Sequence, residues 1–214
     1  MLTKIKNELI YLSTLRRILS SLKAINNDEN SIITKRIASF ADKSPDSIAI
    51  YFEDREISYR ELINGANQYS HWFLDNGLQK GDVVALLMEN RPEFLMAWIG
   101  IAQVGGTAAL INTNLTGHPL NHSLSISGAN KLILGKELVS NFETTDDTIK
   151  SSFQVWIEGE TDKTNYEKLN LALEKLSNIM PSINYNVTNE DVALYIYTSG
   201  TTGDPKAATI HIED

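Results

Sequence analysis

The chain has 214 residues and a formal net charge of -8, with 27 acidic side chains against 19 Lys and Arg. This length suits one domain with a sizeable core, and a hydrophobic content of 42% excludes disordered and fibrous classes. The acidic balance, without a basic cluster in the body of the chain, disfavours nucleic acid as the main partner. The absence of cysteine excludes disulfide scaffolds, cysteine-ligated metal centres and cysteine nucleophiles.

Residues 1–25 differ from the rest of the chain in charge and in pattern. They carry five basic side chains against Glu8, a balance of +4, and apolar residues recur every three or four positions, which predicts one apolar face of a helix. This leucine stripe consists of Leu2, Ile5, Leu9, Leu12, Leu15, Leu19 and Leu22. Two interpretations stay open: an interfacial helix on anionic lipid, or a helix that packs on its own domain or on a partner.

We assign residues 1–30 to this amphipathic helix and a linker, and we expect a cytoplasmic protein that can associate with a membrane surface through residues 1–25. A transmembrane helix is not expected, because no window approaches about 18 uninterrupted apolar residues. After the linker, residues 31–42 have the pattern of a second amphipathic helix, and residues 48–52 and 57–59 predict a hairpin. Ser58 and Glu61 have the spacing of a capping box, which predicts a helix that ends at Asn76 before Gly77.

Strand and helix patterns then alternate along the chain. The predicted strands are 83–88, 107–111, 131–134 and 153–157, and the predicted helices are 94–104, 120–126, 138–142 and 166–176. This order predicts an α/β fold, a parallel sheet with helices on both faces, in which ligands bind at the carboxyl ends of the strands. The first three of these strands are expected to be parallel neighbours joined by right-handed crossovers. Trp72, Trp98 and Trp156 are expected in the core.

A polar segment rich in hydroxyls and glycines lies between two strand-like runs, 192–197 and 207–212. Its residues are Thr198, Ser199, Gly200, Thr201, Thr202, Gly203, Asp204, Pro205 and Lys206. Two glycines three apart let the backbone bend and present N–H groups to an anion, the hydroxyls donate hydrogen bonds, and Lys206 adds a cation. An ordinary polar turn is the alternative, but a turn needs only about four residues. The segment therefore suits a polyphosphate.

Other phosphate and metal sites fit the sequence less well. A Walker loop needs Lys followed by Ser or Thr at the start of a helix, whereas Lys206 stands between Pro205 and Ala207 and leads into a strand. A Rossmann glycine fingerprint is absent. His118 and His122 are four residues apart, but no third ligand accompanies them, so we expect no metal site of the chain's own.

The run Tyr-Thr-Ser-Gly-Thr-Thr-Gly-x-Pro-Lys at residues 197–206 resembles the phosphate-binding signature of the acyl-adenylate-forming enzymes, which include acyl-CoA synthetases, luciferases and adenylation domains. Most members have Gly after the lysine, where this chain has Ala207. That variant, with residues 89–94 and 108–115, resembles the branch of long-chain and very long-chain acyl-CoA synthetases also called fatty acid transport proteins. The resemblance runs from about residue 31 to residue 208 and covers about the first third of a family member.

The resemblance implies that residues 31–214 form a partial adenylation domain, the amino-terminal part of the family's large domain. It implies a two-step ligase, in which ATP with Mg²⁺ and a long-chain fatty acid give an acyl-adenylate, and coenzyme A then forms the thioester. Carried over to this sequence, the nucleotide-binding residues are Tyr197, Thr198, Ser199, Gly200, Thr201, Thr202, Gly203 and Lys206. Lys206 would contact the β- and γ-phosphates.

The family's later motifs, for adenine, ribose, the hinge and the adenylation-promoting lysine, are expected beyond Asp214, so the catalytic residues are unknown. We therefore expect the chain to be a truncated product, a gene fragment or an alternative isoform that is inactive alone. An alternative function from another class is a non-enzymatic remnant that acts as a membrane-peripheral or interaction module.

Overall fold

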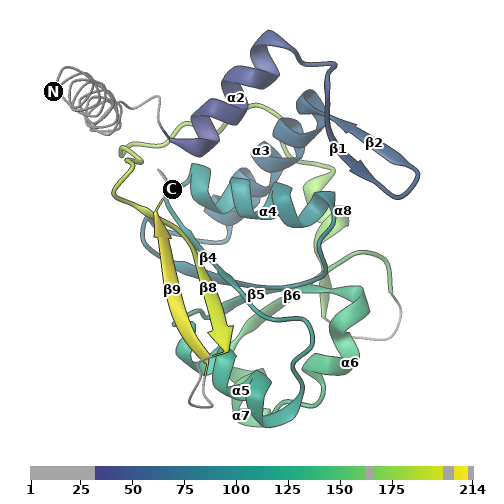
Figure 1. The fold of residues 1–214 in the computed structure, drawn as a ribbon, viewed down its shortest axis with the longest axis vertical. Coiled ribbons are helices and arrows are strands. Elements are labelled where there is room, and N and C mark those ends of the chain that lie inside the picture. The colour runs from purple at the N-terminus through teal and green to yellow at the C-terminus, as the bar shows by residue number, and fades with distance from the viewer. Residues whose placement is uncertain (1–31, 162–165, 200–204, 212–214) are drawn as a thin grey trace, which may run out of the picture.

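A seven-stranded sheet forms the centre of the computed structural model, which describes residues 32–161, 166–199 and 205–211, with the backbone alone at 198–199 and 205–207. The strand order is β7-β6-β5-β3-β4-β8-β9 (Figure 1). A separate antiparallel hairpin, formed by β1 (Ile48–Phe52) and β2 (Arg55–Ser58), projects from one side. The predicted amphipathic segment 1–30 lies outside the described residues.

The sheet is parallel except at one edge. Its strands are β3 (Val83–Leu87), β4 (Thr107–Leu110), β5 (Lys131–Gly135), β6 (Gln154–Glu158), β7 (Glu167–Lys168), β8 (Val192–Ser199) and β9 (Pro205–His211). β3 pairs in parallel with both β4 and β5, so the predicted parallel neighbours are confirmed. β9 pairs antiparallel with β8 and forms the edge.

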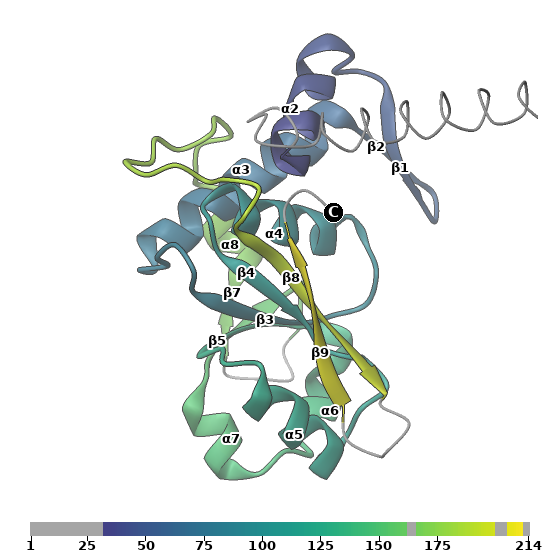
Figure 2. The same cartoon turned by 60° about the vertical axis from the view of Figure 1, so that its left-hand side comes forward.

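Helices cover both faces of the sheet, as the α/β pattern predicted (Figures 1 and 2). One face carries α2 (Ile33–Lys43), α3 (Tyr59–Asp75), α4 (Pro92–Gln103) and α8 (Leu169–Leu173). The other face carries α5 (Gly117–Ile126), the 3₁₀ turn η2 (Lys136–Leu138), α6 (Val139–Phe142) and α7 (Asp147–Ser152). The sheet is therefore the middle of three layers.

The longest helix among the described residues, α3, begins where the capping box predicted. The Glu61 N–H donates to Ser58 Oγ at 3.2 Å, and the Ser58 N–H donates to Glu61 Oε2 at 2.8 Å. The bond from the Ser58 N–H, and after it the bond from the Ser58 hydroxyl to Glu61 Oε2 at 2.8 Å, lower the pKa of Glu61 because they stabilise the carboxylate. The helix ends at Asp75, and Gly77 follows with a φ of 75°, a left-handed conformation that glycine adopts without strain.

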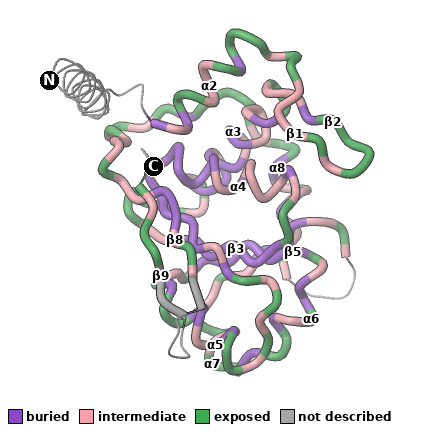
Figure 3. Tube along the Cα trace, in the orientation of Figure 1, coloured by how far each residue is buried: buried purple, intermediate pink, exposed green. Residues whose placement is uncertain are grey.

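Each face of the sheet has its own buried layer, visible as the purple segments of Figure 3. Toward α3 and α4, the Trp72 and Trp156 rings meet edge to face with centroids 4.7 Å apart, and both side chains are buried as predicted. Trp98 is only partly buried. Toward α5 and α6, Phe142 is fully buried beside Leu120.

The helix predicted at 166–176 is wrong in its first part. Residues Glu167–Lys168 form β7, which pairs in parallel with β6, and only Leu169–Leu173 is helical. The Trp156 indole N–H also donates to Glu167 Oε2 at 3.1 Å. Sheet pairing at the edge thus outweighs the local helical pattern, because it satisfies backbone groups of two strands at once. The short helix α7 was not predicted.

Candidate functional site

The candidate loop follows β8, which lies between β4 and β9. β8 runs parallel to β4, with Ala108 opposite Leu194 and Leu110 opposite Ile196. Its carboxyl end therefore lies at the same edge of the sheet as the carboxyl ends of β3, β4 and β5, where ligands bind in open α/β sheets. Four of the predicted site residues, Gly200, Thr201, Thr202 and Gly203, lie outside the described residues.

The two ends of the predicted site face one another across the hairpin of β8 and β9. In the antiparallel register, Thr198 is opposite Lys206 and Ser199 is opposite Pro205. Directly opposed residues of antiparallel strands have Cα atoms about 5 Å apart. The structure therefore brings together Thr198, Ser199 and Lys206, which the sequence separates by up to eight positions.

Tyr197 ends the described side chains of β8 and packs, with Tyr195, against the apolar layer under α5. Its hydroxyl is buried without a hydrogen-bond partner among the described residues. Burial, with a smaller contribution from Tyr195, raises the pKa of Tyr197 to about 12. The phenol is therefore neutral at physiological pH and can act as a donor or an acceptor for a group that enters this edge.

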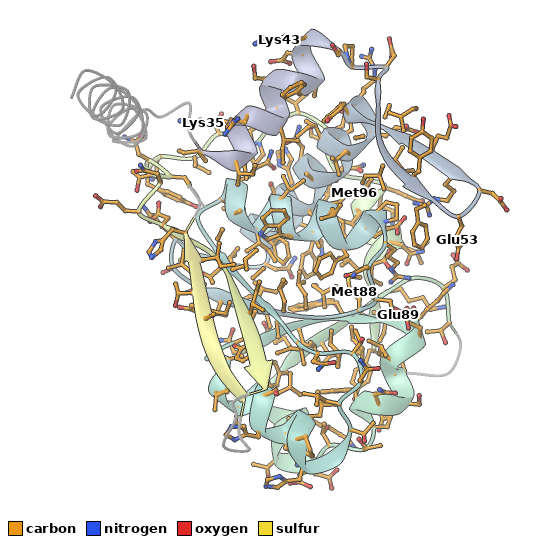
Figure 4. All side chains as sticks on the ribbon, viewed as in Figure 1. Lys35, Lys43, Glu53, Met88, Glu89 and Met96 are labelled. Atoms are coloured by element: carbon orange, nitrogen blue, oxygen red, sulfur yellow. The ribbon has the colours of Figure 1, made fainter. Side chains whose placement is uncertain are left out.

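An ion-pair cluster at the same edge was missed by the sequence analysis. Arg91 precedes α4, and its guanidinium donates to the Glu158 carboxylate and to the Glu158 carbonyl oxygen, the latter at 3.2 Å. Arg91 Nη1 also lies 3.3 Å from Glu137 Oε2, and the other Glu137 oxygen accepts from the Glu89 N–H at 2.9 Å. Figure 4 labels Glu89 just beyond the end of β3. The cluster ties together the carboxyl ends of β3, β5 and β6.

Burial has the largest effect on the Glu158 carboxyl. It raises the pKa of Glu158, while Arg91 acts in the opposite direction and Glu93 and Glu137 add to the rise. Lys136 lowers it slightly, as the last contribution. Arg91 stands directly before the proline that starts a helix, and this position after a strand places it at the edge of the sheet. Only the fold shows that Glu93, Glu137 and Glu158 are its carboxylate neighbours.

Within the part of the chain that the structure describes, there is no group of three or more His, Asp or Glu side chains placed to hold a metal ion. His118 and His122 both lie on α5. The helices of this part also lack the length and apolarity needed to cross a bilayer.

Parallel strands with helices on both faces, and a segment of hydroxyls and glycines in the sequence after β8, are typical of an α/β domain of the nucleotide-binding class. A family model described as AMP-binding enzyme matches residues 37–214, and the chain belongs to this family.

Curated relatives include fatty acid transport proteins. Long-chain fatty acid transport protein 6 of Mus musculus is 32% identical over 185 residues, which cover 83% of this chain and 29% of the relative. Long-chain fatty acid transport protein 1 of Rattus norvegicus is 30% identical over 211 residues, with 96% and 32% covered. The chain thus spans about three tenths of the length of these relatives.

Solved structures of acyl-CoA ligases have the same fold. A fatty acyl CoA synthetase of Mycobacterium tuberculosis aligns with a TM-score of 0.73 and 26% identity, over 87% of this chain and 36% of that one. The anthranilate CoA ligase AuaEII, in complex with anthranoyl-AMP, aligns with a TM-score of 0.75 over 84% of this chain and 34% of that one. Because its sequence is only 24% identical, the similarity to AuaEII is a similarity of fold alone.

Proposed function

We propose that this chain supplies the phosphate-binding part of an AMP-forming, ATP-dependent fatty acid–CoA ligase. One observation carries the proposal: residues 197–206 have the order of a phosphate-binding signature and begin at the carboxyl end of β8, a strand parallel to β4 that ends at the ligand-binding edge of an AMP-binding enzyme fold. The relatives named as long-chain fatty acid transport proteins and the solved fatty acyl CoA synthetase support a fatty acid as the acyl substrate.

In the proposed reaction, a fatty acid carboxylate attacks the α-phosphorus of ATP, a carboxyl–phosphate bond forms, and the bond to pyrophosphate breaks. The coenzyme A thiol then attacks the acyl carbon, AMP leaves, and the thiol loses its proton. The hydroxyls and backbone N–H groups of residues 198–203, together with the Lys206 ammonium, would stabilise the charge that develops on the pyrophosphate. The phosphate oxygens of a polyphosphate with bound Mg²⁺ accept hydrogen bonds from donors of these kinds.

A binding measurement tests the loop directly. The full 214-residue chain is titrated with Mg²⁺–ATP by calorimetry, and Lys206→Ala is expected to weaken binding about 10- to 100-fold, since a charge-assisted contact contributes about 1.5 to 3 kcal/mol. Lys175→Ala, at an exposed lysine of the segment after α8, is the matched control and should bind as the unmodified chain does. Equal affinity of all three proteins would mean that 198–206 is a polar turn, and would favour a non-enzymatic interaction module.

Turnover is a separate expectation. Phosphate contacts alone do not orient a carboxylate for in-line attack, and positioning supplies much of the rate of such reactions. Residues 1–214 alone are therefore expected to release no pyrophosphate from oleate, ATP and coenzyme A. Sustained release that Lys206→Ala abolishes would show that these residues are an enzyme by themselves, while leaving the assignment of the loop intact.

A further inference from the structure

A cavity of about 650 Å³ lies far from the candidate loop along the sheet, between α2, α3 and the irregular segment 177–191 that leads into β8. Figure 2 shows this segment, which we term the strap, running beside α3 and the start of α2. The apolar part of the cavity wall is formed by Ile32, Ile63, Ile179, Met180, Ile183 and Val187. The proposed ligase function leaves this cavity unused.

Side chains of α3 hold the first part of the strap in place. Asn67 Nδ2 donates to the Asn178 carbonyl oxygen at 2.8 Å, and His71 Nε2 donates to the Ile179 carbonyl oxygen at 2.8 Å. Gln68 makes a longer contact of 3.4 Å with the carbonyl oxygen of Leu176. The rim of the cavity is therefore fixed by bonds to a long helix.

The second part of the strap is also held by side chains from the rest of the fold. The Tyr185 hydroxyl donates to the Val104 carbonyl oxygen at 2.9 Å, and Lys80 Nζ donates to the Asn186 carbonyl oxygen at 2.8 Å. Lys80 also forms an ion pair with Asp191 at 2.8 Å. Because both ends are anchored, the cavity is preformed and an occupant does not have to order its walls.

The mouth of the cavity exposes large apolar side chains. Ile179 is 73% exposed and Met180 is 40% exposed, although the cavity wall continues inward to the fully buried Ile32. Apolar side chains gathered at the mouth of a cavity mark a surface that another apolar element covers. No described residue covers Ile179, as its exposure shows.

We propose that the leucine stripe of residues 1–25 packs into the mouth of this cavity as an intramolecular cover. The chain enters the cavity wall at Ile32, so residues 26–31 form a linker of at most about 20 Å between the stripe and its site. A tether this short gives an effective concentration in the millimolar range, which favours the chain's own segment over a separate partner.

The shape of the cavity agrees with this occupant. The total charge of -8 and the balance of +4 over residues 1–25 leave -12 for the rest of the chain, which attracts the segment to the body of the molecule as a whole. The charged residues that line the cavity, Lys35 and Asp42, offset one another, so the apolar wall and the short tether select this site. A row of leucine side chains can fill a concave cavity, whereas the smooth surface of a bilayer cannot follow its wall. Of the two interpretations of the amphipathic segment, packing on its own domain is therefore favoured over lipid.

The absence of cysteine allows a direct test on the full chain, because an engineered thiol is the only one present. Met180→Cys reports on the cavity mouth through its rate of reaction with a water-soluble thiol reagent. Adding Leu12→Glu, Leu15→Glu and Leu19→Glu should accelerate the reaction roughly tenfold, the ratio expected for a segment that is docked about 90% of the time.

The control protein carries three added glutamates away from the stripe, in Thr3→Glu, Thr14→Glu and Ser21→Glu. In this control, the Met180→Cys thiol should keep most of its protection from the reagent. Tyr51→Cys, at a hairpin position that is 75% exposed, should react at one rate in every background and thereby shows that the fold is intact. Equal Met180→Cys rates in the stripe and control backgrounds would overturn the proposal.

Two further outcomes would assign the stripe elsewhere. Protection that rises with protein concentration would identify a second copy of the chain as the occupant and would contradict intramolecular docking. An unprotected Met180→Cys, together with stripe-dependent flotation on vesicles of phosphatidylserine and phosphatidylcholine, would assign the stripe to lipid. Thiol exposure is measured without ATP, so failure of this proposal leaves the ligase proposal untouched.

Discussion

The face of the sheet under α3 and α4 and the face under α5, α6 and α7 are closed by different interactions. α3 has 17 residues and α4 has 12, and they cross closely, with aromatic side chains such as Phe73 filling the space between them and the sheet. A long helix presents an apolar stripe over several turns, so packing holds most of this layer. Ser70 adds a buried polar contact between the two helices, because its Oγ lies 3.0 Å from the Gly100 carbonyl oxygen and 2.8 Å from Gln103 Oε1.

The helices on the opposite face have only 10, 4 and 6 residues. Their loops are joined by polar side chains: Asn121 Nδ2 donates to Asp146 Oδ2 at 2.6 Å, and the Asp146 N–H donates to Asn121 Oδ1 at 3.1 Å. Asn141 Nδ2 likewise donates to the Thr113 carbonyl oxygen at 3.0 Å. Each short helix buries only a small apolar surface, so hydrogen bonds between the loops also fix the positions of these helices.

The largest effect is expected from breaking the aromatic packing of the α3 and α4 face. Phe73→Ala removes a fully buried ring and should lower the free energy of unfolding by about 3 to 5 kcal/mol, measured by urea denaturation. Phe40→Ala is the matched control, because that ring is 57% exposed and only stacks on Tyr59, so its loss should cost about 1 kcal/mol. Similar costs for the two variants would show that this layer is not held by packing.

The close approach of α3 and α4 gives a second test. A Cβ at Gly100 would lie 2.7 Å from the Ala66 carbonyl oxygen and from Tyr69 Cβ, so Gly100→Ala should destabilise by about 1 to 3 kcal/mol. Gly65→Ala, at the same helix contact, meets the flexible thioether of Met96, which Figure 4 labels on α4. That variant should be neutral or stabilise by up to about 1 kcal/mol, since alanine favours a helix. Thermal unfolding of both proteins decides, and a harmless Gly100→Ala would refute the close crossing.

A smaller loss is expected on the opposite face, where Asn121→Ala removes both hydrogen bonds to Asp146. It should cost about 1 to 2 kcal/mol, because a buried partner is lost. Ser125→Ala removes only an exposed hydroxyl that donates to the Asn121 carbonyl oxygen, and should cost less than about 0.5 kcal/mol. If urea denaturation gives Asn121→Ala no more effect than Ser125→Ala, polar ties do not hold this face.

The smallest expected effect is a pH dependence at the edge where the two layers meet. Because the pKa of Glu158 is raised by burial, its contribution to stability is fully present below its usual value of 4.5 and is lost as the pH rises through the raised value. Glu158→Gln should therefore gain stability relative to the unmodified chain between pH 4.5 and 7. Urea denaturation across that range measures the difference, and a constant difference would contradict the raised pKa.

Local signals in the sequence predicted several elements correctly. The Ser58–Glu61 spacing predicted the start of α3, and the alternation of apolar runs with helix patterns predicted the parallel order of β3, β4 and β5. These features depend on residues that are close together in the chain, or on periodicity within one element, so the sequence alone contains them.

The ion-pair cluster and the strap could not be predicted in this way. Arg91 meets Glu137 and Glu158 across 46 and 67 positions, and α3 holds the strap across more than 100 positions. No local pattern encodes such partners, because each contact exists only once the strands are in register. The prediction of a helix at residues 167–168 was wrong for the same reason, because a strand of two residues is defined only by its pairing with β6.

By itself, the amino-acid order of this protein determined most of its helices and strands and the α/β class, and it contains the signature at residues 197–206 from which we propose phosphate binding. The tertiary structure alone decided that Thr198 faces Lys206 across a hairpin, that three carboxylates gather around Arg91, and that a preformed cavity opens beside Ile32. The physical reason is that propensity and capping act within a few residues, whereas burial, ion pairing and cavity shape arise from elements that meet only in the folded chain.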